Sequence, residues 1–370
     1  MIKLIDLNYH THSDLSNPED VLELQKASIG FVDFINEKVS IQLIKHLNYE
    51  GEKFIEGVKY IFFKSKNKFW YIPFKTHRYI QKQNPDIVLV QGLIFPLQLI
   101  ALKIKLGKKI KVIIQHHGEK PYPGIKGLFQ KLADHFIDMY LFTTVENANE
   151  WIKKKIISNK EKCSELLEAS TSFKLKEKLQ CKCSLGFTGN QNYLWVGRLN
   201  VGKDPITVIS AFEKYIISCP EARLFMIFQT EELLPLIKRE LEKNQQLKKA
   251  MILKGKVKHS ELEAWFNAAD FFISGSHKEG SGYALIEAMC CGCIPIVTSI
   301  PSFKKITCDG TFGFLFEPGN SESLLNILLN LKNVGKEKLS SSVVEHFNHS
   351  LSFNSIADEL VTICEKLMLK

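Results

Sequence analysis

The sequence predicts an α/β protein of two successive domains, each built on a parallel sheet. The chain of 370 residues exceeds what one ordinary hydrophobic core supports. Short apolar runs alternate along it with longer segments of helical spacing, which is typical of β-α-β units. A polar, lysine-rich stretch from 158 to 185 interrupts this alternation. We therefore expect an N-terminal domain over residues 1–183 and a C-terminal domain over residues 184–351.

The first half opens with an alternating strand and a polar loop from His10 to Asp20, in which Ser16 to Glu19 suit a helix start. Its expected strands are Ile2–Asn8, Ile87–Gln91, Lys111–Gln115 and Met139–Thr143. Its expected helices run from about Asn17 to Asn36, from Phe95 to Leu106 before Gly107, and from Glu146 to Lys155. Ligands of such a parallel sheet bind at the carboxyl ends of its strands, so the pair His116-His117 is a candidate site.

The second half repeats the alternation with its own strands and helices. The expected strands are Tyr193–Val196, Leu224–Phe228, Ile252–Leu253, Ala269–Ser274, Ile294–Thr298 and Gly313–Phe316. The expected helices are Ile206–Ile217, Leu262–Ala268 and Gly282–Cys291, with Gly292 as its stop. The tail from Ser352 to Leu369 is apolar at helical spacing, and we expect this helix, within residues 352–370, to cross back to the first domain.

The stretch from Ser276 to Pro295 organises the second half. It reads as a glycine-rich turn, G-S-G at 280–282, between a buried strand and a helix. The first N–H groups of a helix lack intrahelical partners and lie at the positive end of its dipole, so they favour an anion such as a diphosphate. Two acids, Glu279 and Glu287, flank this turn.

Composition narrows the class of protein. The chain is 45% hydrophobic and 24% charged, as expected of a globular protein. The N-terminus lacks the pattern of a signal peptide, and the longest apolar run, 87–102, is too short and too polar to span a bilayer. We therefore expect a cytoplasmic protein. The nine cysteines, an odd number without an export signal, are expected to be free thiols. We expect no zinc site at Cys290 and Cys293, because no His is spaced to complete it.

Positive charge is concentrated in the first half. Between Lys53 and Lys131 the sequence has sixteen Lys or Arg residues and three acids. No nucleic-acid recognition motif accompanies this charge, so we do not expect a nucleic-acid partner. An anionic membrane surface or a phosphate-bearing acceptor remains possible, and so does an ordinary lysine-rich surface.

The order of features in the second half, from V-G-R-L at 196–199 through E-P-G-N at 317–320, resembles the retaining glycosyltransferases of the GT-B type, in particular family 4. The spacing of Glu279 and Glu287 matches the E-x7-E of that family. The resemblance implies two Rossmann-like domains that face each other across a cleft, with the donor held by the second domain. It is looser over the first half.

The resemblance also implies roles for individual residues. Arg198 and Lys203 would hold the donor diphosphate, which needs cations and N–H groups. Glu287 would accept the ribose hydroxyls and Glu279 the hydroxyls of the transferred sugar. The backbone amides of Gly280, Ser281, Gly282 and Tyr283 would face phosphate and sugar, and the backbone of Val257 would read the base. His117 matches the family histidine near the reacting sugar, although the sequence leaves His116 open.

The sequence departs from the family pattern after the first strand. N-Y-H-T-H-S-D, at 8–14, stands where the family often has a glycine-rich loop. His10-x-His12 with Asp14 also resembles the first metal motif of the PHP-type phosphoesterases, whose fold is a (βα) barrel. A metal-dependent phosphoesterase is therefore one alternative, and a non-catalytic sugar-nucleotide-binding module is another.

The sequence thus predicts a retaining hexosyltransferase that uses no cofactor. No D-x-D is present to bridge a metal to the diphosphate, so we expect metal-independent transfer. The expected donor is a UDP-, GDP- or ADP-sugar and the expected acceptor is a saccharide or a lipid-linked molecule, as in cell-surface polysaccharide synthesis. Such a protein could lie peripherally at the inner face of the membrane.

Overall fold

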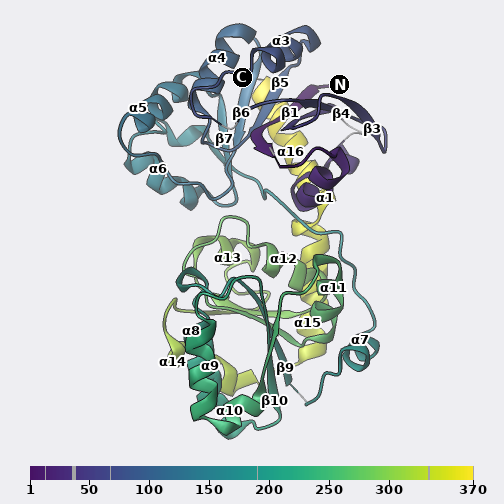
Figure 1. Ribbon diagram of the computed structural model, residues 1–370, viewed down its shortest axis with the longest axis vertical. Coiled ribbons are helices and arrows are strands. Elements are labelled where there is room, and N and C mark those ends of the chain that lie inside the picture. The colour runs from purple at the N-terminus through teal and green to yellow at the C-terminus, as the bar shows by residue number, and fades with distance from the viewer. Residues whose placement is uncertain (13, 36–38, 67, 190, 332–333, 370) are drawn as a thin grey trace. The chain divides into compact units, whose positions relative to one another are not determined.

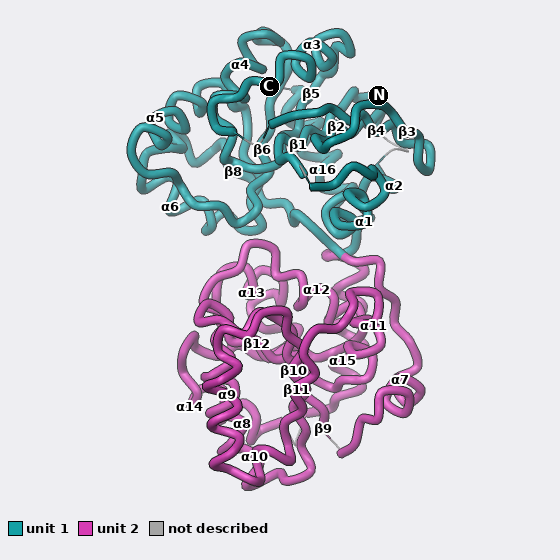
Figure 2. Tube along the Cα trace, viewed as in Figure 1, with its two compact units in different colours: residues 1–170, 352–370 teal, residues 171–351 magenta. Residues whose placement is uncertain are grey.

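The computed structural model describes the chain except for residues 13, 36–38, 67, 190, 332–333 and 370 (Figure 1). The chain divides into two compact units (Figure 2). Unit 1 comprises Met1–Ser170 together with Ser352–Lys370, and unit 2 comprises Thr171–Leu351. Each unit is an α/β domain with its own sheet, so the predicted fold of two Rossmann-like domains, the GT-B fold, is confirmed.

Unit 1 contains an eight-stranded sheet in the order β3-β4-β2-β1-β5-β6-β7-β8. Neighbouring strands are parallel except for β3, which pairs antiparallel with β4 at the edge. The strands are β1 (Lys3–His12), β2 (Ser40–Leu47), β3 (Gly51–Ile55), β4 (Val58–Phe63), β5 (Ile87–Gln91), β6 (Lys111–Gln115), β7 (Met139–Phe142) and β8 (Cys163–Glu165). Strand order reverses between β1 and β5, which is the position where ligands bind in open α/β sheets.

Helices connect these strands and cover an apolar core that includes Val88, Val90 and Ile114. The helices of unit 1 are α1 (Pro18–Ile29), α2 (Val32–Ile35), α3 (Phe74–Gln83), α4 (Pro96–Leu106), α5 (Gly124–Ala133), α6 (Asn149–Lys153) and the C-terminal α16 (Phe353–Met368). The helix predicted from about Asn17 therefore forms two pieces, and its predicted end at Asn36 lies outside the described residues. The α16 helix packs against α2 and groups with unit 1.

Strand β1 is longer than the sequence pattern indicated. It continues past Asn8 to His12, and its pairing with β2 shifts register between Leu7 and Thr11. The segment expected to be a polar loop from His10 is therefore partly strand. Such an irregularity of pairing includes the β-bulges that commonly lie beside functional sites. Ser13, which belongs to the same segment, lies outside the described residues.

Unit 2 contains a six-stranded sheet in the order β11-β10-β9-β12-β13-β14, and all its strands are parallel. The strands are β9 (Gln191–Gly197), β10 (Ala222–Phe228), β11 (Met251–Gly255), β12 (Phe271–Ser274), β13 (Ile294–Thr298) and β14 (Phe314–Phe316). The central strands are almost continuously apolar because helices cover both faces of the sheet. Strand order reverses between β9 and β12.

Helix α8 begins with a clear capping signal close to this reversal point. Asp204 caps α8, because its side chain accepts from the N–H of Thr207 at 3.1 Å, and Pro205 occupies the first turn. The helices are α7 (Lys178–Leu185), α8 (Pro205–Ser218), α9 (Leu234–Lys243), α10 (Gln245–Ala250), α11 (His259–Ala268), α12 (Tyr283–Cys290), α13 (Pro301–Ile306), α14 (Ser321–Asn330) and α15 (Lys336–His346).

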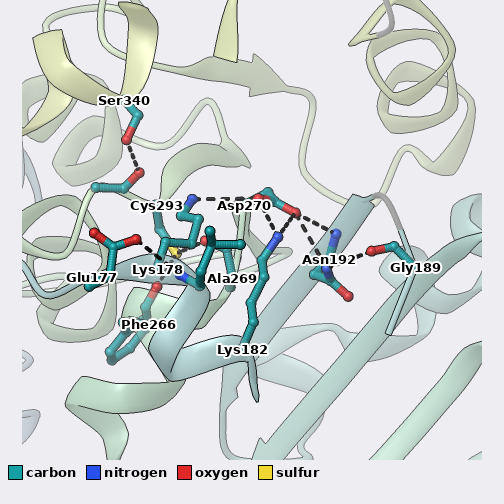
Figure 3. A network of polar contacts seen from close by, with 12 residues as sticks. Glu177, Lys178, Lys182, Gly189, Asn192, Phe266, Ala269, Asp270, Cys293 and Ser340 are labelled. Atoms are coloured by element: carbon teal, nitrogen blue, oxygen red, sulfur yellow. Dashed lines mark hydrogen bonds and ion pairs between the residues drawn. The ribbon is translucent and has the colours of Figure 1, made fainter. Parts of the chain in front are cut away.

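The buried carboxylate of Asp270 binds the first helix and the first strand of unit 2, α7 and β9 (Figure 3). Asp270, just before β12, accepts from the backbone N–H of Asn192 at 3.0 Å and from Lys182 at 3.0 Å. Although burial raises the pKa of Asp270, Lys178 and Lys182 hold it below its usual value. The helix α7 is thereby part of unit 2. The expected domain boundary after residue 183 would cut this helix, whereas the units divide after Ser170.

The thiols of Cys290 and Cys293, considered above as zinc ligands, donate to backbone carbonyls instead. The Cys290 thiol lies 2.9 Å from the Phe173 carbonyl, and the Cys293 thiol lies 3.0 Å from the Phe266 carbonyl. All nine cysteines are free thiols, as expected. Among the described residues, no helix is both long enough and apolar enough to cross a membrane.

Candidate functional site

The carboxyl ends of β9, β11 and β12 lie at one edge of the unit 2 sheet, because these strands are parallel. This edge carries the turns that follow the three strands. Most of the residues predicted to bind the donor are in those turns or directly after them, and they are Arg198, Lys203, Val257, Glu279, Gly280, Ser281, Gly282 and Tyr283. Glu287 follows on α12.

The turn after β9 is a single 3₁₀ turn, Val201–Lys203. The side chain of Asn200 accepts from the backbone N–H of Lys203 at 3.0 Å and fixes this turn. Asp204 then adopts a left-handed conformation with φ of 40°. The turn packs closely against the segment after β12, since a Cβ on Gly275 would lie 2.6 Å from the Asp204 carbonyl oxygen. The residue type at 275 is therefore fixed by backbone contact.

One ion pair and two hydrogen bonds fix the position of Glu279. The Lys203 ammonium forms an ion pair with Glu279 Oε1, and the hydroxyl of the fully buried Ser276 donates to the same oxygen at 2.6 Å. The Ser302 hydroxyl donates to the Glu279 backbone carbonyl at 2.7 Å. The two strands that flank the reversal point therefore present a cation and a carboxylate in direct contact.

The G-S-G turn positions the start of α12. Gly282 precedes the helix with φ of 67°, in the left-handed region that favours glycine. A Cβ at this position would also lie 2.7 Å from the Ile306 side chain. A residue with a Cβ would be strained at this φ, so glycine suits the turn that leads into the first N–H groups of α12. Tyr283, the first helical residue, is partly exposed.

Glu287 is buried on α12 and bonds to a residue that the sequence analysis did not single out. The His259 Nε2 atom lies 2.6 Å from Glu287 Oε1, and the His259 ring packs against Phe173 at 5.1 Å between ring centres. One carboxylate oxygen of Glu287 thus already accepts a hydrogen bond from His259. Arg198 is exposed just beyond β9, and Val257 is half buried beyond β11.

In unit 1, His117 lies just beyond β6 and bonds at both ring nitrogens. Its Nε2 lies 2.6 Å from Gln91 Oε1, and its Nδ1 forms an ion pair with the buried Glu168. The Gln91 amide nitrogen donates to Asp6 on β1. Residues from β1, from β5 and from segments beyond β6 and β8 thus form one hydrogen-bonded chain at the carboxyl edge of the sheet.

This chain determines the protonation of His117. Gln91 must turn its NH₂ group toward the Asp6 carboxylate, so its carbonyl oxygen faces His117 and requires a donor. The Glu168 carboxylate requires a donor on the other ring nitrogen. Although burial lowers the pKa of His117, the hydrogen bond and charge of Glu168 raise it above its usual value. This pattern of acceptors favours the imidazolium form of His117.

His116 is not part of this hydrogen-bonded chain and is buried in unit 1. Its ring contacts Phe142 and Trp151 at 4.8 and 5.9 Å between ring centres. Burial lowers its pKa. Only 4% of His116 is exposed, whereas 28% of the His117 side chain is exposed, so His117 is the accessible member of the pair.

The His10-x-His12 segment lies at the end of β1. The two rings contact each other at 5.0 Å between centres, and His12 Nε2 lies 3.0 Å from the Gln25 amide. No three His, Cys, Asp or Glu side chains in the described part of the chain gather as metal ligands. The (βα) barrel required by the phosphoesterase alternative is not the fold, because the chain forms two doubly wound sheets.

Sequence reasoning missed the partners that hold the predicted residues. These are Asn200, His259 and Ser276 in unit 2, and Gln91 and Glu168 in unit 1. Gln91 could have been predicted from the sequence, because it is a polar residue at the carboxyl end of an expected strand. No sequence pattern indicated His259 or Glu168, because each contacts a residue that is distant in the sequence.

Known proteins resemble this chain in sequence, and the family model that matches lies within its second unit. Residues 182–341 match the family model described as "Glycosyl transferases group 1". A poly(glycerol-phosphate) alpha-glucosyltransferase of Bacillus subtilis is 28% identical over 68% of this chain and 37% of its own length. An uncharacterized glycosyltransferase of Methanocaldococcus jannaschii is 24% identical over 80% of this chain and 79% of its own.

A third relative, a UDP-Gal:alpha-D-GlcNAc-diphosphoundecaprenol alpha-1,3-galactosyltransferase of Escherichia coli, is 27% identical over 56% of this chain and 54% of its own length. The chain thus spans about a third to four fifths of these relatives. Among solved structures, Anabaena HepE in complex with UDP superposes with a TM-score of 0.73 at 14% identity, over 99% of this chain and 100% of that one. That likeness shows a shared fold.

Proposed function

We propose that this chain, whose residues 182–341 are a glycosyl transferases group 1 domain, moves a hexose or N-acetylhexosamine from a nucleotide sugar to a saccharide or lipid-linked acceptor. Transfer retains the anomeric configuration and needs no metal. The observation that carries the proposal is the contact between Lys203 and Glu279 at the point where strand order reverses in unit 2.

The diphosphate of the donor binds to cations and helix N–H groups in this proposal. Lys203 and Arg198 both follow β9, and the start of α12 follows β12. The positive charge of these groups stabilises the negative charge that develops on the leaving diphosphate. Removing one such preorganised donor typically slows an enzyme about 10²–10³-fold. The two side chains thereby supply what a metal ion supplies in other transferases.

Carboxylates bind the two sugars. Glu279 lies beside Lys203, so a sugar hydroxyl on Glu279 and a phosphate on Lys203 would be adjacent, as they are in a nucleotide sugar. Glu287 accepts from the ribose. Because His259 already occupies Oε1, we assign the ribose contact to Oε2. The backbone amides of Gly280, Ser281, Gly282 and Tyr283 face phosphate and sugar, and the backbone of Val257 faces the base.

The reaction exchanges one bond at the anomeric carbon. The bond from that carbon to the diphosphate oxygen breaks, and its electrons go to the diphosphate. The acceptor hydroxyl oxygen forms the new bond on the same face of the sugar. Its proton goes to the departing phosphate oxygen, so no nucleophile from the protein is needed.

His117 contributes a fixed positive charge at the carboxyl edge of unit 1. Both ring N–H groups are committed to Gln91 and Glu168, so His117 does not act as a general base. We assign it the electrostatic stabilisation of the reacting sugar through the charge of its ring.

The acceptor carries phosphate in this proposal. The names of two relatives describe acceptors of that kind, a poly(glycerol-phosphate) and a diphosphoundecaprenol. Both names also specify an alpha linkage. The lysine-rich first half suits an anionic acceptor, and synthesis of a cell-surface polysaccharide at the inner face of the membrane is the setting we infer.

A binding panel tests the donor assignment. The protein is titrated with UDP, GDP and ADP and with their hexose and N-acetylhexosamine derivatives, and the melting temperature is followed. We expect one nucleotide series to raise it, and the sugar to add to the effect of the nucleotide. No shift with any of them would contradict the proposal. Binding of a donor without any turnover would favour the non-catalytic module instead.

A further inference from the structure

Helix α5 presents an apolar stripe to solvent. Ile125, Leu128 and Leu132 stand at helical spacing on one face and are 63%, 61% and 49% exposed. The opposite face is fixed inside unit 1, where Gln130 accepts from Tyr122 N–H at 2.8 Å and donates to the Leu93 carbonyl at 2.9 Å. The exposed stripe is therefore held outward by the fold.

An aromatic cluster extends this stripe. Trp70 is 60% exposed, and its ring contacts Phe129 of α5 at 5.7 Å between centres. Phe69 contacts both Trp70 and Phe129. The segment before α3 and helix α5 thus share one surface of apolar side chains. Tryptophan is characteristic of surfaces with one apolar and one wet side, such as the membrane interface.

Exposed lysines border the same surface. Lys126 and Lys131 flank the stripe on α5, and the Lys126 ammonium lies 5.0 Å from the centre of the Phe69 ring. By contrast, Lys103, another lysine of the basic first half, forms an ion pair inside unit 1. It donates to Asp138 at 2.8 Å. The lysines of α5 are therefore better placed than Lys103 to meet an anionic surface.

We propose that this surface, the α5 face formed by Trp70, Ile125, Lys126, Leu128, Lys131 and Leu132, docks on an anionic lipid bilayer. A short amphipathic helix with lysines beside an apolar stripe lies in the plane of the interface, with its apolar side chains among the upper acyl chains. Each lysine near an anionic leaflet adds to the attraction.

A second copy of the chain fits this surface less well. In a two-fold dimer each patch meets its own counterpart, so Lys126 and Lys131 of one copy would approach those of the other. Like charges at such a contact repel each other. An anionic bilayer offers the opposite charge and an apolar interior together, which is why we assign it as the occupant.

The position of the α5 face links it to the proposed function, on which this last step rests. The loop from His117 to Pro123 runs directly into α5. The carboxyl edge of the unit 1 sheet and the α5 face are therefore joined by a short segment. A lipid-linked acceptor could reach that edge while its lipid stays in the bilayer.

Vesicle sedimentation of the full chain tests the docking without donor or acceptor. We expect binding to phosphatidylcholine vesicles that contain phosphatidylglycerol, weaker binding without it, and a decline as salt rises. Leu128→Ser/Leu132→Ser should weaken binding about tenfold or more, because two apolar side chains lose their burial. Lys126→Gln/Lys131→Gln should weaken it on anionic vesicles and leave the low binding to neutral vesicles unchanged.

Matched controls come from unit 2. Ile217→Ser removes an apolar side chain that is at least as exposed, and Lys248→Gln/Lys249→Gln removes two exposed lysines; both should bind as the unaltered chain does. Unchanged binding by both α5 variants, or no preference for anionic vesicles, would overturn the proposal. So would a dimer that Leu128→Ser/Leu132→Ser converts to monomer without any loss of vesicle binding. Donor turnover is measured separately in solution, so a failure of docking leaves the proposed function standing.

Discussion

Lys203 and Glu279 form an ion pair although 76 positions separate them in the sequence. Lys203 ends the turn after β9, and Glu279 lies in the turn after β12. The pair exists because these two strands are neighbours at the reversal of strand order, so their carboxyl ends bring the two turns together. Opposite charges in contact at a binding edge fit a ligand with an anionic part beside a hydroxyl-rich part.

Loss of the Lys203 charge should weaken nucleotide binding. We expect Lys203→Met to lower the affinity for the nucleoside diphosphate about tenfold or more, because a charge-assisted bond to phosphate is lost. Isothermal titration calorimetry measures the change. Lys214→Met is the matched control, since Lys214 pairs with Glu322 on an exposed surface. Equal affinity of the two variants would remove Lys203 from the site.

Glu287 should recognise the ribose. The unaltered protein is expected to bind the nucleoside diphosphate more tightly than its 2′-deoxy form, because a carboxylate accepts from the ribose hydroxyls. Glu287→Gln should reduce this discrimination several-fold. His259→Ala tests the positioning by His259, and it should weaken binding of both nucleotides. If discrimination in Glu287→Gln equals that of the unaltered protein, the ribose lies elsewhere.

Two buried histidines should make stability depend on pH. Burial lowers the pKa of His46 to about 4, and burial with the charge of His46 lowers that of His77 to about 4. In the unfolded chain both take up protons near the ordinary value of about 6.5. The stability that these two neutral histidines give the folded protein is therefore fully present above pH about 6.5, and it is lost as the pH falls toward 4.

The size of this effect follows from the two shifts. Each histidine should cost roughly 3 kcal/mol of unfolding free energy by pH 4. Urea unfolding at pH 7 and 4.5 measures it in the unaltered protein and in His46→Gln/His77→Gln. The variant should lose less free energy over this interval. Equal losses in both proteins would show that other groups cause the pH dependence.

His117 should stay protonated at neutral pH. Glu168 and Gln91 both accept from its ring, so its pKa lies above the ordinary value. The stabilisation it gives is complete below about pH 6.5 and is lost as the pH rises through the raised pKa. The ¹⁵N shifts of the two ring nitrogens report protonation directly. Glu168→Gln should lower the pKa, and a neutral His117 at pH 7 in the unaltered protein would contradict this assignment.

Chelation should leave transfer unaffected. Arg198 and Lys203 supply positive charge to the leaving diphosphate in the proposed reaction, so EDTA is expected to change the rate by less than about twofold. The assay is transfer from the donor that the binding panel identifies. A rate that falls with EDTA and recovers with Mg²⁺ or Mn²⁺ would show a metal requirement.

The sequence predicts most of unit 2 because its strands contain short, nearly continuous apolar runs. Tyr193–Val196 and Ile294–Thr298 are clear in this way. The strands β2 and β4 were missed because polar residues interrupt them. Lys45, inside β2, is buried against Asp6 at 3.5 Å, and such long-range pairing leaves no local pattern. The extension of β1 depends on its pairing with β2, which local sequence cannot show.

Some residues of the candidate site could likewise be predicted from the sequence, and others could not. The family resemblance made Arg198, Lys203, Glu279 and Glu287 candidates, because each follows a recognisable strand or lies on the following helix. It could not identify His259, since its bond to Glu287 links α11 to α12. It also could not choose between His116 and His117. That choice depends on which ring the core of unit 1 buries.

The most direct test is release of nucleoside diphosphate and sugar transfer by the purified chain, compared with Glu279→Gln. Glu317→Gln is the matched control, because Glu317 is an exposed acid near the other end of the family pattern. We expect turnover by the unaltered chain and the control, a loss of about 10²-fold or more in Glu279→Gln, and a product that keeps the anomeric configuration of the donor. Undiminished turnover by Glu279→Gln, or inversion in the product, would contradict the account.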